Sequence, residues 1–388
     1  MSVNHNASAL EAIIQQQIDE AGGWIPFEAF MRAALYEPKL GYYESSHVFG
    51  EEGDFVTGVD MGSWLALGFA DLIEWGWQEL GSPSQWALVE QGGGSGKLIS
   101  SVLSLLKERN LLPSRIVAID ASSEMRGRQQ LFYADQQLEV ESFATIEEVG
   151  EIENCIVFCN ELPDAFPVRC FSWKGGEAYE RGVAHSNGDF IWQDATMKMS
   201  LPLDIDPKIS SAWPDGYVSD WNPNLKEWQT KMSKMIRRGF LFCVDYGYSQ
   251  QEYYRAQRVE GTLLGHQGHQ VVEDVLKQPG MCDITAHVDF TSLRRIGDAI
   301  GMSACSYMSQ GAWLAQSPSV QRRIESLAAE GSVESVQELA HAKRMLMPFG
   351  MGETFKLLIQ SCHHKHSVPG YLTHFDRIDD LRAEKGVA

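Results

Sequence analysis

Apolar residues recur at helical spacing in the first part of the chain. Residues 10–21 form an amphipathic helical pattern that Gly22-Gly23 ends, and residues 28–36 predict a second helix. Residues 63–80 form a longer helical pattern that carries three tryptophans. The segment before it, residues 41–57, is rich in glycine and aromatic residues and is predicted to be a loop.

Further along, the pattern changes to short apolar runs that each end in a polar or acidic residue. These runs cover residues 86–90, 115–119, 156–159 and 240–244. Helices are predicted between them, from about residue 97 to 109 and from 227 to 238. Short buried strands separated by helices favour a Rossmann-like parallel α/β sheet with helices on both faces. Ligands bind at the carboxyl ends of the strands in such sheets.

The remaining segments predict additions to this sheet. Residues 168–192 alternate apolar and polar side chains and contain two glycine turns, which predicts inserted β-hairpins. Residues 248–280 are irregular, and helices and strands are predicted over residues 289–300, 302–308, 319–344 and 353–360. We therefore expect an N-terminal helical extension (1–50), a core (51–362) with insertions near 168–195, 248–290 and 317–345, and a loosely held polar tail (363–388).

Composition narrows the classes of partner. The 388 residues carry a formal net charge of -20, so the chain has no general attraction for nucleic acid or anionic membranes. No apolar run is long enough to span a bilayer, and the start of the chain lacks the arginines of a transit peptide. Seven cysteines without a CxxC pair indicate a reducing compartment, and the cytoplasm is the expected location.

No metal site is expected. The three histidines of the tail, His363, His364 and His366, are adjacent in a polar segment and are predicted to be solvated. The oligomeric state stays open, with a homodimer among the options.

A glycine-rich loop between a predicted strand and helix is the main functional motif. Its sequence, residues 90–97, is Glu-Gln-Gly-Gly-Gly-Ser-Gly-Lys. A Walker A loop is disfavoured because Leu98 replaces the hydroxyl residue that holds magnesium. A dinucleotide fingerprint is weakened by Lys97 at its third glycine position. A third interpretation, E-x-G-x-G-x-G with Glu90, Gly92, Gly94 and Gly96, is similar to the first motif of class I methyltransferases.

That third interpretation needs an acid at the end of the next strand. Asp120 stands there, and its two carboxylate oxygens can accept hydrogen bonds from both ribose hydroxyls of S-adenosylmethionine. A glycine-rich turn without any ligand remains the alternative.

Five further segments, in order along the chain, strengthen this interpretation because they resemble the MidA family of methyltransferases. They are Gly53-Asp54-Phe55-Val56-Thr57, the segment 160–168, Asp245-Tyr246-Gly247, Gly261-Thr262-Leu263, and Pro279-Gly280 with the segment 283–290. The resemblance implies a class I methyltransferase fold and S-adenosylmethionine as the cofactor. It also implies a protein acceptor, since a mitochondrial member of the family acts on an arginine of a complex I subunit.

The chain departs from the family pattern at several positions. Residues 58–62 replace a Pro-Glu-Ile-Ser type run, Gln91 and Gly93 replace an apolar residue and proline, and Lys97 replaces threonine. Asp120 stands where glutamate is common. The glycines and acidic groups are kept, so these changes bear on substrate choice and cofactor contacts more than on the fold.

Candidate residues for chemistry lie mainly after the third apolar run. Methyl transfer consists of positioning the acceptor and removing its proton, and a guanidinium acceptor requires carboxylates. Glu161 and Asp164 are the predicted acceptor-facing carboxylates, with Asn160 orienting them and also bordering the cofactor. The alternative is that both acids only cap the following turn.

Two further groups are candidates. Asp54, Phe55 and Thr57 are a candidate lid over the cofactor or an ordinary turn. His287, like His269, is a candidate base or a structural hydrogen-bonding residue. Beside a methyltransferase acting on protein arginine, two functions stay open, namely a cofactor-binding assembly factor without turnover and a small-molecule methyltransferase.

Overall fold

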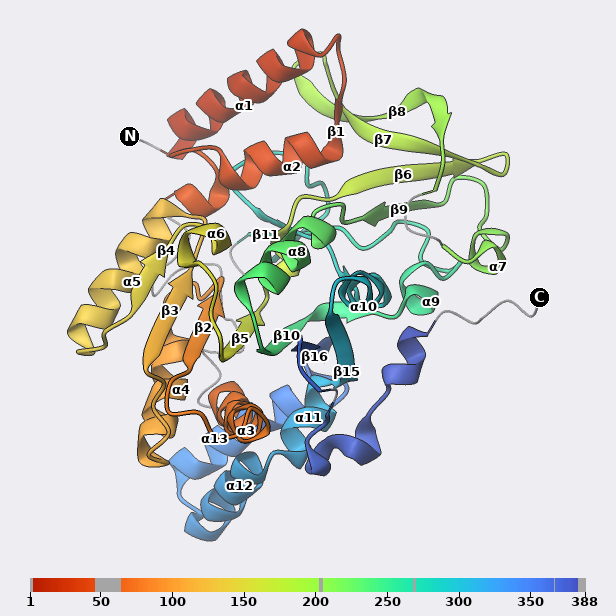
Figure 1. The fold of residues 1–388 in the computed structure, drawn as a ribbon. Helices are drawn as coiled ribbons and strands as arrows, with labels where there is room; N and C mark the ends of the chain where they lie inside the picture. Colours follow the sequence, from red (N-terminus) through yellow and green to blue (C-terminus); the bar gives the residue numbers. More distant parts are fainter. Residues whose placement is uncertain (1–2, 46–63, 202–204, 268–269, 366, 383–388) are drawn as a thin grey trace.

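The computed structural model describes residues 3–45, 64–201, 205–267, 270–365 and 367–382. At its centre lies an eight-stranded sheet with the order β15-β16-β10-β5-β2-β3-β4 and the short β14 paired with β10 (Figure 1). The strands are β2 (Ala87–Gln91), β3 (Arg115–Ile119), β4 (Glu141–Phe143), β5 (Cys155–Asn160), β10 (Gly239–Tyr248), β14 (Val288–Asp289), β15 (Met302–Ser309) and β16 (Phe355–Cys362). The four predicted apolar runs form β2, β3, β5 and β10.

The direction of the strands agrees with the prediction except at β16. Strands β4, β3, β2, β5 and β10 pair in parallel. Strand β16 lies between β10 and β15 and runs antiparallel to both. An apolar run predicts a buried strand but not its direction, which is why the antiparallel strand was not predicted.

Helices cover both faces of this sheet, because buried strands present apolar side chains alternately to each side. On β5, Ile156 and Phe158 join the cluster that contains α3 and α4. Cys155, Val157 and Cys159 join the cluster that contains α8 and α10 on the other face. The helices are α3 (Trp64–Glu79), α4 (Lys97–Glu108), α8 (Leu225–Met235) and α10 (Phe290–Ala299). The Rossmann-like α/β class is confirmed.

Three elements at one edge of the sheet were not predicted. They are α5 (Ser123–Asp135), β4 and the short α6 (Ile146–Val149). Helix α5 buries Met125, Gln129 and Tyr133 at four-residue spacing, so its inward stripe contains a polar residue in place of an apolar one. Strand β4 is an edge strand without a fully buried residue, and it therefore has no apolar pattern.

A second layer lies across the carboxyl ends of the parallel strands (Figure 1). It combines α1 (Val3–Glu20), α2 (Phe27–Tyr36) and η1 (Tyr42–Glu44) with an antiparallel sheet. That sheet contains β1 (Ile25–Pro26), β6 (Arg169–Lys174), β7 (Glu177–Ser186), β8 (Asp189–Met199) and β9 (Val218–Trp221). The predicted hairpins over residues 168–192 are thus present as β6, β7 and β8.

One hydrophobic cluster holds this layer together. It joins Leu10 and Phe30 of the N-terminal helices to Val183 of β7 and to Ile284 of β13. The irregular segment after β10 contributes α9 (Gln250–Tyr253), β11 (Leu264–Gln267), β12 (Gln270–Val272) and β13 (Asp283–Thr285). Segments far apart in the sequence therefore form one layer above the strand ends. We call this layer, which contains α1, α2, η1, β1, β6–β9 and β11–β13, the roof.

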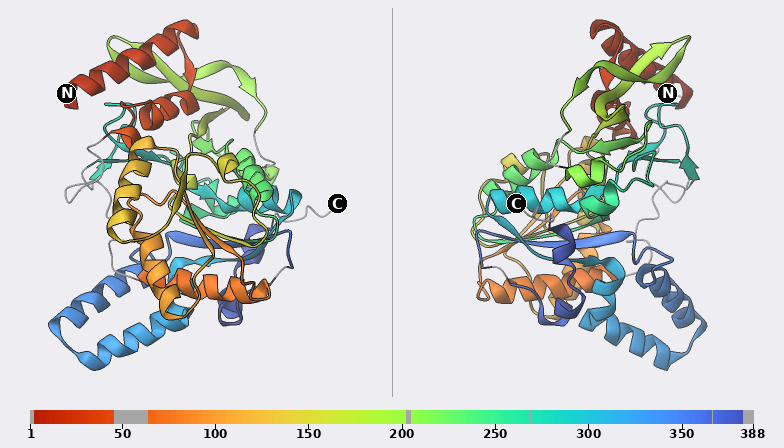
Figure 2. Two further views of the ribbon diagram at one scale, coloured as in Figure 1. Left: turned by 60° about the vertical axis from the view of Figure 1, so that its left-hand side comes forward. Right: turned by 90° about the vertical axis from the view of Figure 1, so that its right-hand side faces the viewer.

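The end of the chain packs more closely than predicted. Helices α12 (Pro318–Glu330) and α13 (Val333–Leu346) form a hairpin that projects from the far side of the sheet beside α11 (Gln310–Gln316) (Figure 2). After β16, η3 (Gly370–Phe375) and η4 (Ile378–Leu381) bury Leu372 and Leu381. Residues 367–382 of the segment expected to be a loosely held tail therefore pack on the core, because Leu372 and Leu381 are buried among apolar residues.

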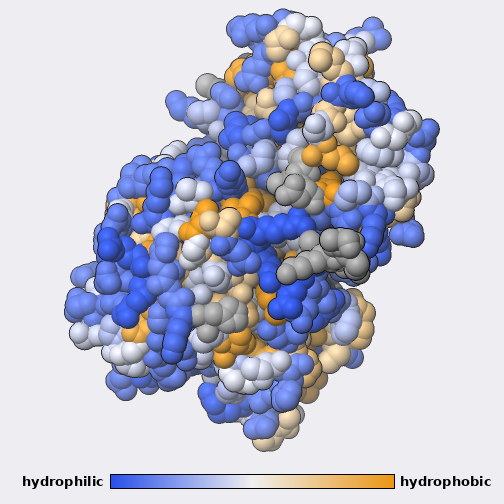
Figure 3. All heavy atoms as spheres, turned by 45° about the vertical axis from the view of Figure 1, so that its right-hand side comes forward, coloured by the Kyte–Doolittle hydropathy of each residue, from blue (hydrophilic) through white to orange (hydrophobic). Residues whose placement is uncertain are grey.

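The seven cysteines are all buried and free of disulfides. The face of the molecule in Figure 3 is largely hydrophilic, with hydrophobic residues in smaller patches between the polar ones. In the described part of the chain, no helix combines the length and apolar character needed to cross a membrane.

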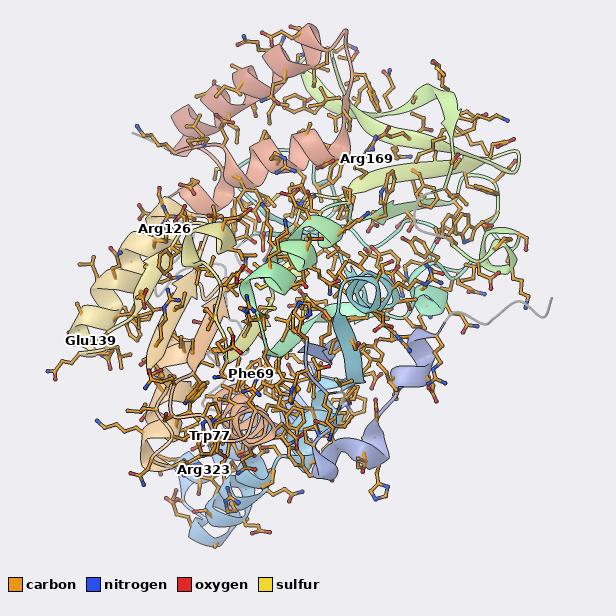
Figure 4. All side chains as sticks on the ribbon, viewed as in Figure 1. Phe69, Trp77, Arg126, Glu139, Arg169 and Arg323 are labelled. Carbon is orange, nitrogen blue, oxygen red and sulfur yellow. The ribbon has the colours of Figure 1, made fainter. Side chains whose placement is uncertain are left out.

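We expect Phe158→Ala to destabilise the fold strongly, because Phe158 is fully buried and its ring lies 5.0 Å from that of Phe69, which is labelled in Figure 4. Loss of a buried phenylalanine costs about 3–5 kcal/mol in free energy of unfolding. Urea unfolding measures this change. The control Phe349→Ala removes a ring that is 80% exposed and should shift stability by less than about 0.5 kcal/mol. Equal effects of the two substitutions would contradict the assigned core.

Candidate functional site

A cavity of about 870 Å³ lies where the parallel strands end beneath the second layer. Its walls come from the loops after β2, β3, β4 and β5, and from α2, η1 and α8. This volume is toward the upper end of the range for small-molecule sites. The cavity occupies the position where ligands bind in open α/β sheets.

The glycine loop after β2 forms one wall of the cavity. Gly92, Gly94 and Gly96 all have positive φ angles, of 72°, 51° and 78°, which side chains rarely adopt. A Cβ on Gly93 would fall 2.4 Å from the carboxylate of Glu90. A Cβ on Gly94 would meet no atom within 4 Å, since that position faces open space. The loop therefore brings bare backbone to the edge of the cavity, as the sequence predicted.

The predicted ribose acid, Asp120, lies opposite this loop. Its carboxylate accepts hydrogen bonds from the backbone N–H of Ser122 and from Nε2 of Gln129, each at 3.0 Å. The same Gln129 nitrogen donates to the carbonyl of Gly94 at 3.0 Å. Arg126, labelled in Figure 4, donates to the backbone carbonyl of Asp120. Gln129 thus ties the glycine loop to the acid at a fixed separation.

Two carboxyl groups in the cavity have raised pKa values. Burial is the main cause for both, and it raises the pKa of Glu90 to about 8 and that of Asp120 to about 6. The negative charge of Asp120 adds to the effect on Glu90. Buried acids with such shifts in a cleft are typical of functional sites.

At the end of β5, Asn160 and Glu161 form the wall next to the glycine loop. Asn160 Nδ2 donates to Glu161 Oε1 at 2.9 Å, and the Tyr246 hydroxyl donates to Oε2 at 3.3 Å. The backbone N–H of Glu161 donates to the carbonyl of Val244 at 2.9 Å. Glu161 has a φ of +52°, an unusual conformation for a residue with a side chain. Such strain persists only where the surroundings enforce it, and it is frequent at functional sites.

Asp164 does not join Glu161 in the cavity, which corrects the expectation of a second acceptor-facing carboxylate. It is 4% exposed, and its backbone N–H donates to Oδ2 of Asp245 at 3.2 Å. Burial and the charge of Glu161 hold the pKa of Asp164 well above its usual range. Asp164 lies in the turn Pro163–Ala165 and is not among the described residues that line the cavity.

His287 also lies away from the cavity lining, so the expectation of a catalytic base is not supported by its position. Its ring stacks on Tyr248 at 5.1 Å, and its Nδ1 is 3.3 Å from the carbonyl oxygen of Thr262. Burial lowers the pKa of His287 to about 4, which leaves the ring neutral and weakly basic at neutral pH. The predicted lid residues Asp54, Phe55 and Thr57, together with His269, lie outside the described residues.

Several lining residues were not predicted. Arg32, Tyr36 and Tyr43 reach the cavity from α2 and η1, and Trp228 reaches it from α8. The Tyr36 hydroxyl donates to the carbonyl of Ala165 at 2.8 Å. Trp228 Nε1 donates to Oε1 of Gln91 at 2.9 Å, which fixes an aromatic wall beside the glycine loop. A tryptophan in a predicted helix is typical of a core position, so no local signal marked Trp228 as a site residue.

The residues present fit S-adenosylmethionine. Glu90 Oε2 and Asn160 Oδ1 are buried and accept no hydrogen bond from the described residues, so they are free for donors of a ligand. The carboxylate of Asp120 keeps acceptor capacity for hydroxyl groups beyond its two bonds. The backbone at Gly94 faces open space, which leaves room for part of the ligand. S-adenosylmethionine carries no phosphate, so the loop does not have to bind an anion. In the described part of the chain, no group of acidic, histidine and cysteine residues could hold a metal ion.

The fold and this site define a class of proteins, the S-adenosylmethionine-dependent methyltransferases. A model of the family described as "Putative S-adenosyl-L-methionine-dependent methyltransferase" matches residues 70–308, more than half of the chain. The chain belongs to this family, and the resemblance to the MidA family is confirmed.

Solved structures agree with this assignment. A crystal structure of a COG1565 superfamily member from Burkholderia thailandensis, bound to S-adenosyl-homocysteine, has a TM-score of 0.87 and 28% identity. It covers 97% of each chain. A second structure from the same organism gives a TM-score of 0.84 at 26% identity, again with 97% coverage of both chains. The predicted cofactor, S-adenosylmethionine, is thereby confirmed.

Curated relatives match over most of their length. The Drosophila melanogaster protein named "Protein arginine methyltransferase NDUFAF7 homolog, mitochondrial" is 27% identical over 370 residues, or 87% of this chain and 81% of that protein. The Danio rerio protein arginine methyltransferase NDUFAF7, also named mitochondrial, is 26% identical over 394 residues, or 90% and 86%.

These names contradict the expected cytoplasmic location. The Drosophila, zebrafish and cattle relatives are all named mitochondrial proteins. The expectation depended on the missing arginines at the start of the chain and on cysteine usage, and neither is sufficient to assign a compartment.

We expect Gly94→Val to weaken cofactor binding strongly without unfolding the protein, because the side chain would enter the cavity. The affinity for S-adenosylmethionine should fall by about 100-fold, equivalent to about 2.8 kcal/mol. Isothermal titration calorimetry measures it. The matched control is Gly216→Val, where φ is +86° and a Cβ also meets nothing, but away from the cavity. Similar losses in both variants would show that backbone strain, not cavity occupancy, is responsible.

We also expect Glu90 to make stability depend on pH. The unfolded chain loses this proton near pH 4.5, whereas the folded chain keeps it up to about 8. The folded state therefore holds more protons in this window, and the free energy of unfolding falls by roughly 1.4 kcal/mol for each pH unit as pH rises through it. Glu90→Gln removes this dependence.

Urea unfolding at pH 5 and pH 8 measures the effect. The free energy of unfolding of Glu90→Gln minus that of wild type should be larger at pH 8 than at pH 5. The control Glu108→Gln, at an exposed site on α4, should show no such difference. Parallel pH profiles for wild type and Glu90→Gln would rule out the raised pKa.

Proposed function

We propose that this chain methylates an arginine side chain of a protein. The observation that carries the proposal is the carboxylate of Glu161, which borders the cofactor cavity and is held at both oxygens by neighbouring side chains. Relatives named protein arginine methyltransferase align along more than four-fifths of this chain and support the same acceptor.

Glu161 is suited to a guanidinium acceptor. A carboxylate binds guanidinium through charge-assisted hydrogen bonds that fix its plane and direction. Asn160 and Tyr246 donate to Glu161 from two sides, and the β10 carbonyl of Val244 holds its backbone. Because these contacts restrain the carboxylate, it is already oriented before an arginine side chain binds.

The bound cofactor supplies an electrophilic methyl group. The protein's part is to align a guanidinium nitrogen with that group and to receive the proton that the nitrogen loses. Glu161 is the proposed group for both tasks, with Oε1 or Oε2 taking the proton. Tyr246 acts through Glu161 as a positioning residue. Its own pKa is raised by burial and by the charge of Glu161, so it stays a hydrogen-bond donor.

The aromatic side chains that line the cavity are proposed to exclude water. Trp228 contacts Phe166 with ring centroids 5.6 Å apart, and Tyr36 and Tyr43 lie 5.5 Å apart on the α2 side. These four rings border the same cavity as Glu161. A dry cavity strengthens the interaction between the carboxylate and a cationic acceptor.

The proposal predicts that Glu161→Gln loses methyl transfer while it keeps cofactor binding. Methyl-labelled S-adenosylmethionine is incubated with the enzyme and a protein extract from cells that lack it, and the labelled amino acids are identified after hydrolysis. Wild type should produce labelled methylarginine. The variant should be slower by about 100-fold or more, because it lacks a base and a charged partner.

Calorimetry on the same samples separates binding from turnover. The cofactor affinity of Glu161→Gln should stay within about two-fold of wild type, a difference of about 0.4 kcal/mol. The control Glu139→Gln changes an exposed residue at the far side of α5 and should methylate at the wild-type rate (Figure 4). Label on lysine, on another residue or only on small molecules would refute an arginine acceptor. Unchanged turnover in Glu161→Gln would refute the assigned residue.

A further inference from the structure

A second, smaller hollow of about 570 Å³ runs along the outer face of α2, and we call it the α2 groove. Its lining includes Glu28, Ala29, Arg32, Ala33, Tyr36 and Glu37. These residues form two rows at four-residue spacing, so they share one face of the helix. Helix α1 provides the opposite side of the groove through Gln17. The groove is therefore built from regular, well-packed elements.

The α2 groove adjoins the cofactor cavity. Arg32 and Tyr36 line both hollows. The Tyr36 hydroxyl also donates to the carbonyl of Ala165, four residues beyond the proposed catalytic Glu161. Asn224, another cavity residue, is 3.5 Å from Oε1 of Glu28 in the groove. A polypeptide that lies in the groove would therefore contact two residues of the cavity wall, Arg32 and Tyr36.

Negative charge dominates this region. Three of the cations that line the cavity are paired with carboxylates. Arg32 binds Glu28 at 2.8 Å and Arg128 binds Glu124 at 3.0 Å. Lys231 is held by two carboxylates, those of Glu147 and Glu227, each at 2.8 Å. Glu37 in the groove and Glu44 in the cavity add further negative charge. The surroundings thus complement a positively charged ligand.

The size of the groove fits a short stretch of polypeptide. Glu28 and Glu37 are nine residues apart, which corresponds to about 13.5 Å along a helix. An extended peptide covers this length with about four residues. The small side chains of Ala29 and Ala33 between the charged positions allow a backbone to approach the helix closely.

We propose that the α2 groove binds the segment of the acceptor protein next to the methylated arginine, and that it selects segments with lysine or arginine close to the target. This inference builds on the proposed function of the cavity. Glu37 is the principal contact for a flanking cation, because Glu28 already pairs with Arg32. The groove provides affinity and sequence preference, whereas Glu161 acts on the target side chain.

The test uses the full-length enzyme with S-adenosylhomocysteine and two short peptides. Each peptide has one central arginine, flanked by lysines in one and by glutamines in the other. Fluorescence anisotropy measures both dissociation constants at low salt and at about 1 M salt, where charges are screened beyond about 3 Å. Wild type should bind the lysine peptide about five-fold more tightly at low salt, and the preference should vanish at high salt.

Charge reversal in the groove identifies the contact. Glu37→Lys should remove the preference for the lysine peptide and leave binding of the glutamine peptide and of S-adenosylhomocysteine unchanged. The matched control is Glu325→Lys, at an exposed site on α12 on the opposite side of the central sheet (Figure 1). It makes the same change in net charge and should keep the preference. Equal binding of the two peptides by wild type, or equal effects of the two variants, would overturn the inference.

Methyl transfer to the two peptides separates this inference from the proposed function. Methylation of arginine without a lysine preference would leave the proposed function intact and refute the groove. A lysine preference that depends on Glu37, with no methyl group on arginine, would support the groove and refute the proposed acceptor. Where both hold, Glu37→Lys raises KM for the lysine peptide and leaves kcat unchanged.

Discussion

Parallel pairing of β5 with β2 on one side and with β10 on the other is the constraint on which the site depends. The register sets Glu90 beside Phe158, and Asn160 beside Val244. The strand ends therefore stand level, and the loops that follow them face one another across a single cavity. A shift of β5 by one residue would turn Asn160 to the opposite face and break the hydrogen bond from Glu161 to Val244. Apolar packing on both faces of β5 resists such a shift.

The same arrangement concentrates buried acids where the sheet meets the roof. Glu90, Asp164, Asp245 and Asp283 are each at most 4% exposed. Burial raises the pKa of Asp245 well above its usual range, as it does for Asp164. A fold that retains such groups loses stability as pH rises, since it must hold protons that water would accept. Hydrogen bonds from Tyr43 to Asp283 and from the backbone of Asp164 to Asp245 offset part of this cost. Burial thus favours the protonated, uncharged form of Glu90, Asp164 and Asp245, and the fold loses stability when they ionise.

Much of this architecture follows from local patterns in the sequence. The glycine loop, Asp120 and Asn160-Glu161 could be predicted because each directly follows a short apolar strand, and strand order brings such positions together. Asp164 was misplaced because one turn of chain after β5 decides whether a side chain enters the cavity or the core. The alternation of apolar residues does not describe such turns. Helix α5 lacked a pattern because its buried stripe contains Gln129, which is the residue that joins Gly94 to Asp120. The local signal for a helix failed at the position where the site required a polar side chain.

Three aromatic residues that line the cavity could not be predicted for a different reason. Tyr36, Tyr43 and Trp228 reach the cavity only because α2, η1 and α8 cross the strand ends, and these contacts span more than a hundred residues of sequence. Long-range packing of this kind depends on the whole fold. A single sequence shows only that these side chains are large and partly apolar.

The shared cluster of the roof has a consequence for biosynthesis. Phe30 contacts Phe190, with ring centroids 5.6 Å apart, and also shares its apolar cluster with Ile284 and Ala286, so part of the surface around α2 is made more than 240 residues later. At roughly 5–20 residues per second, this interval is on the order of 10 to 50 s. Helix α2 can therefore pack first on β7 and β8, and its cluster gains Ile284 and Ala286 only after this interval. The described residues that line the cofactor cavity end at Lys231, so all of them are synthesised before β15 and β16 complete the central sheet.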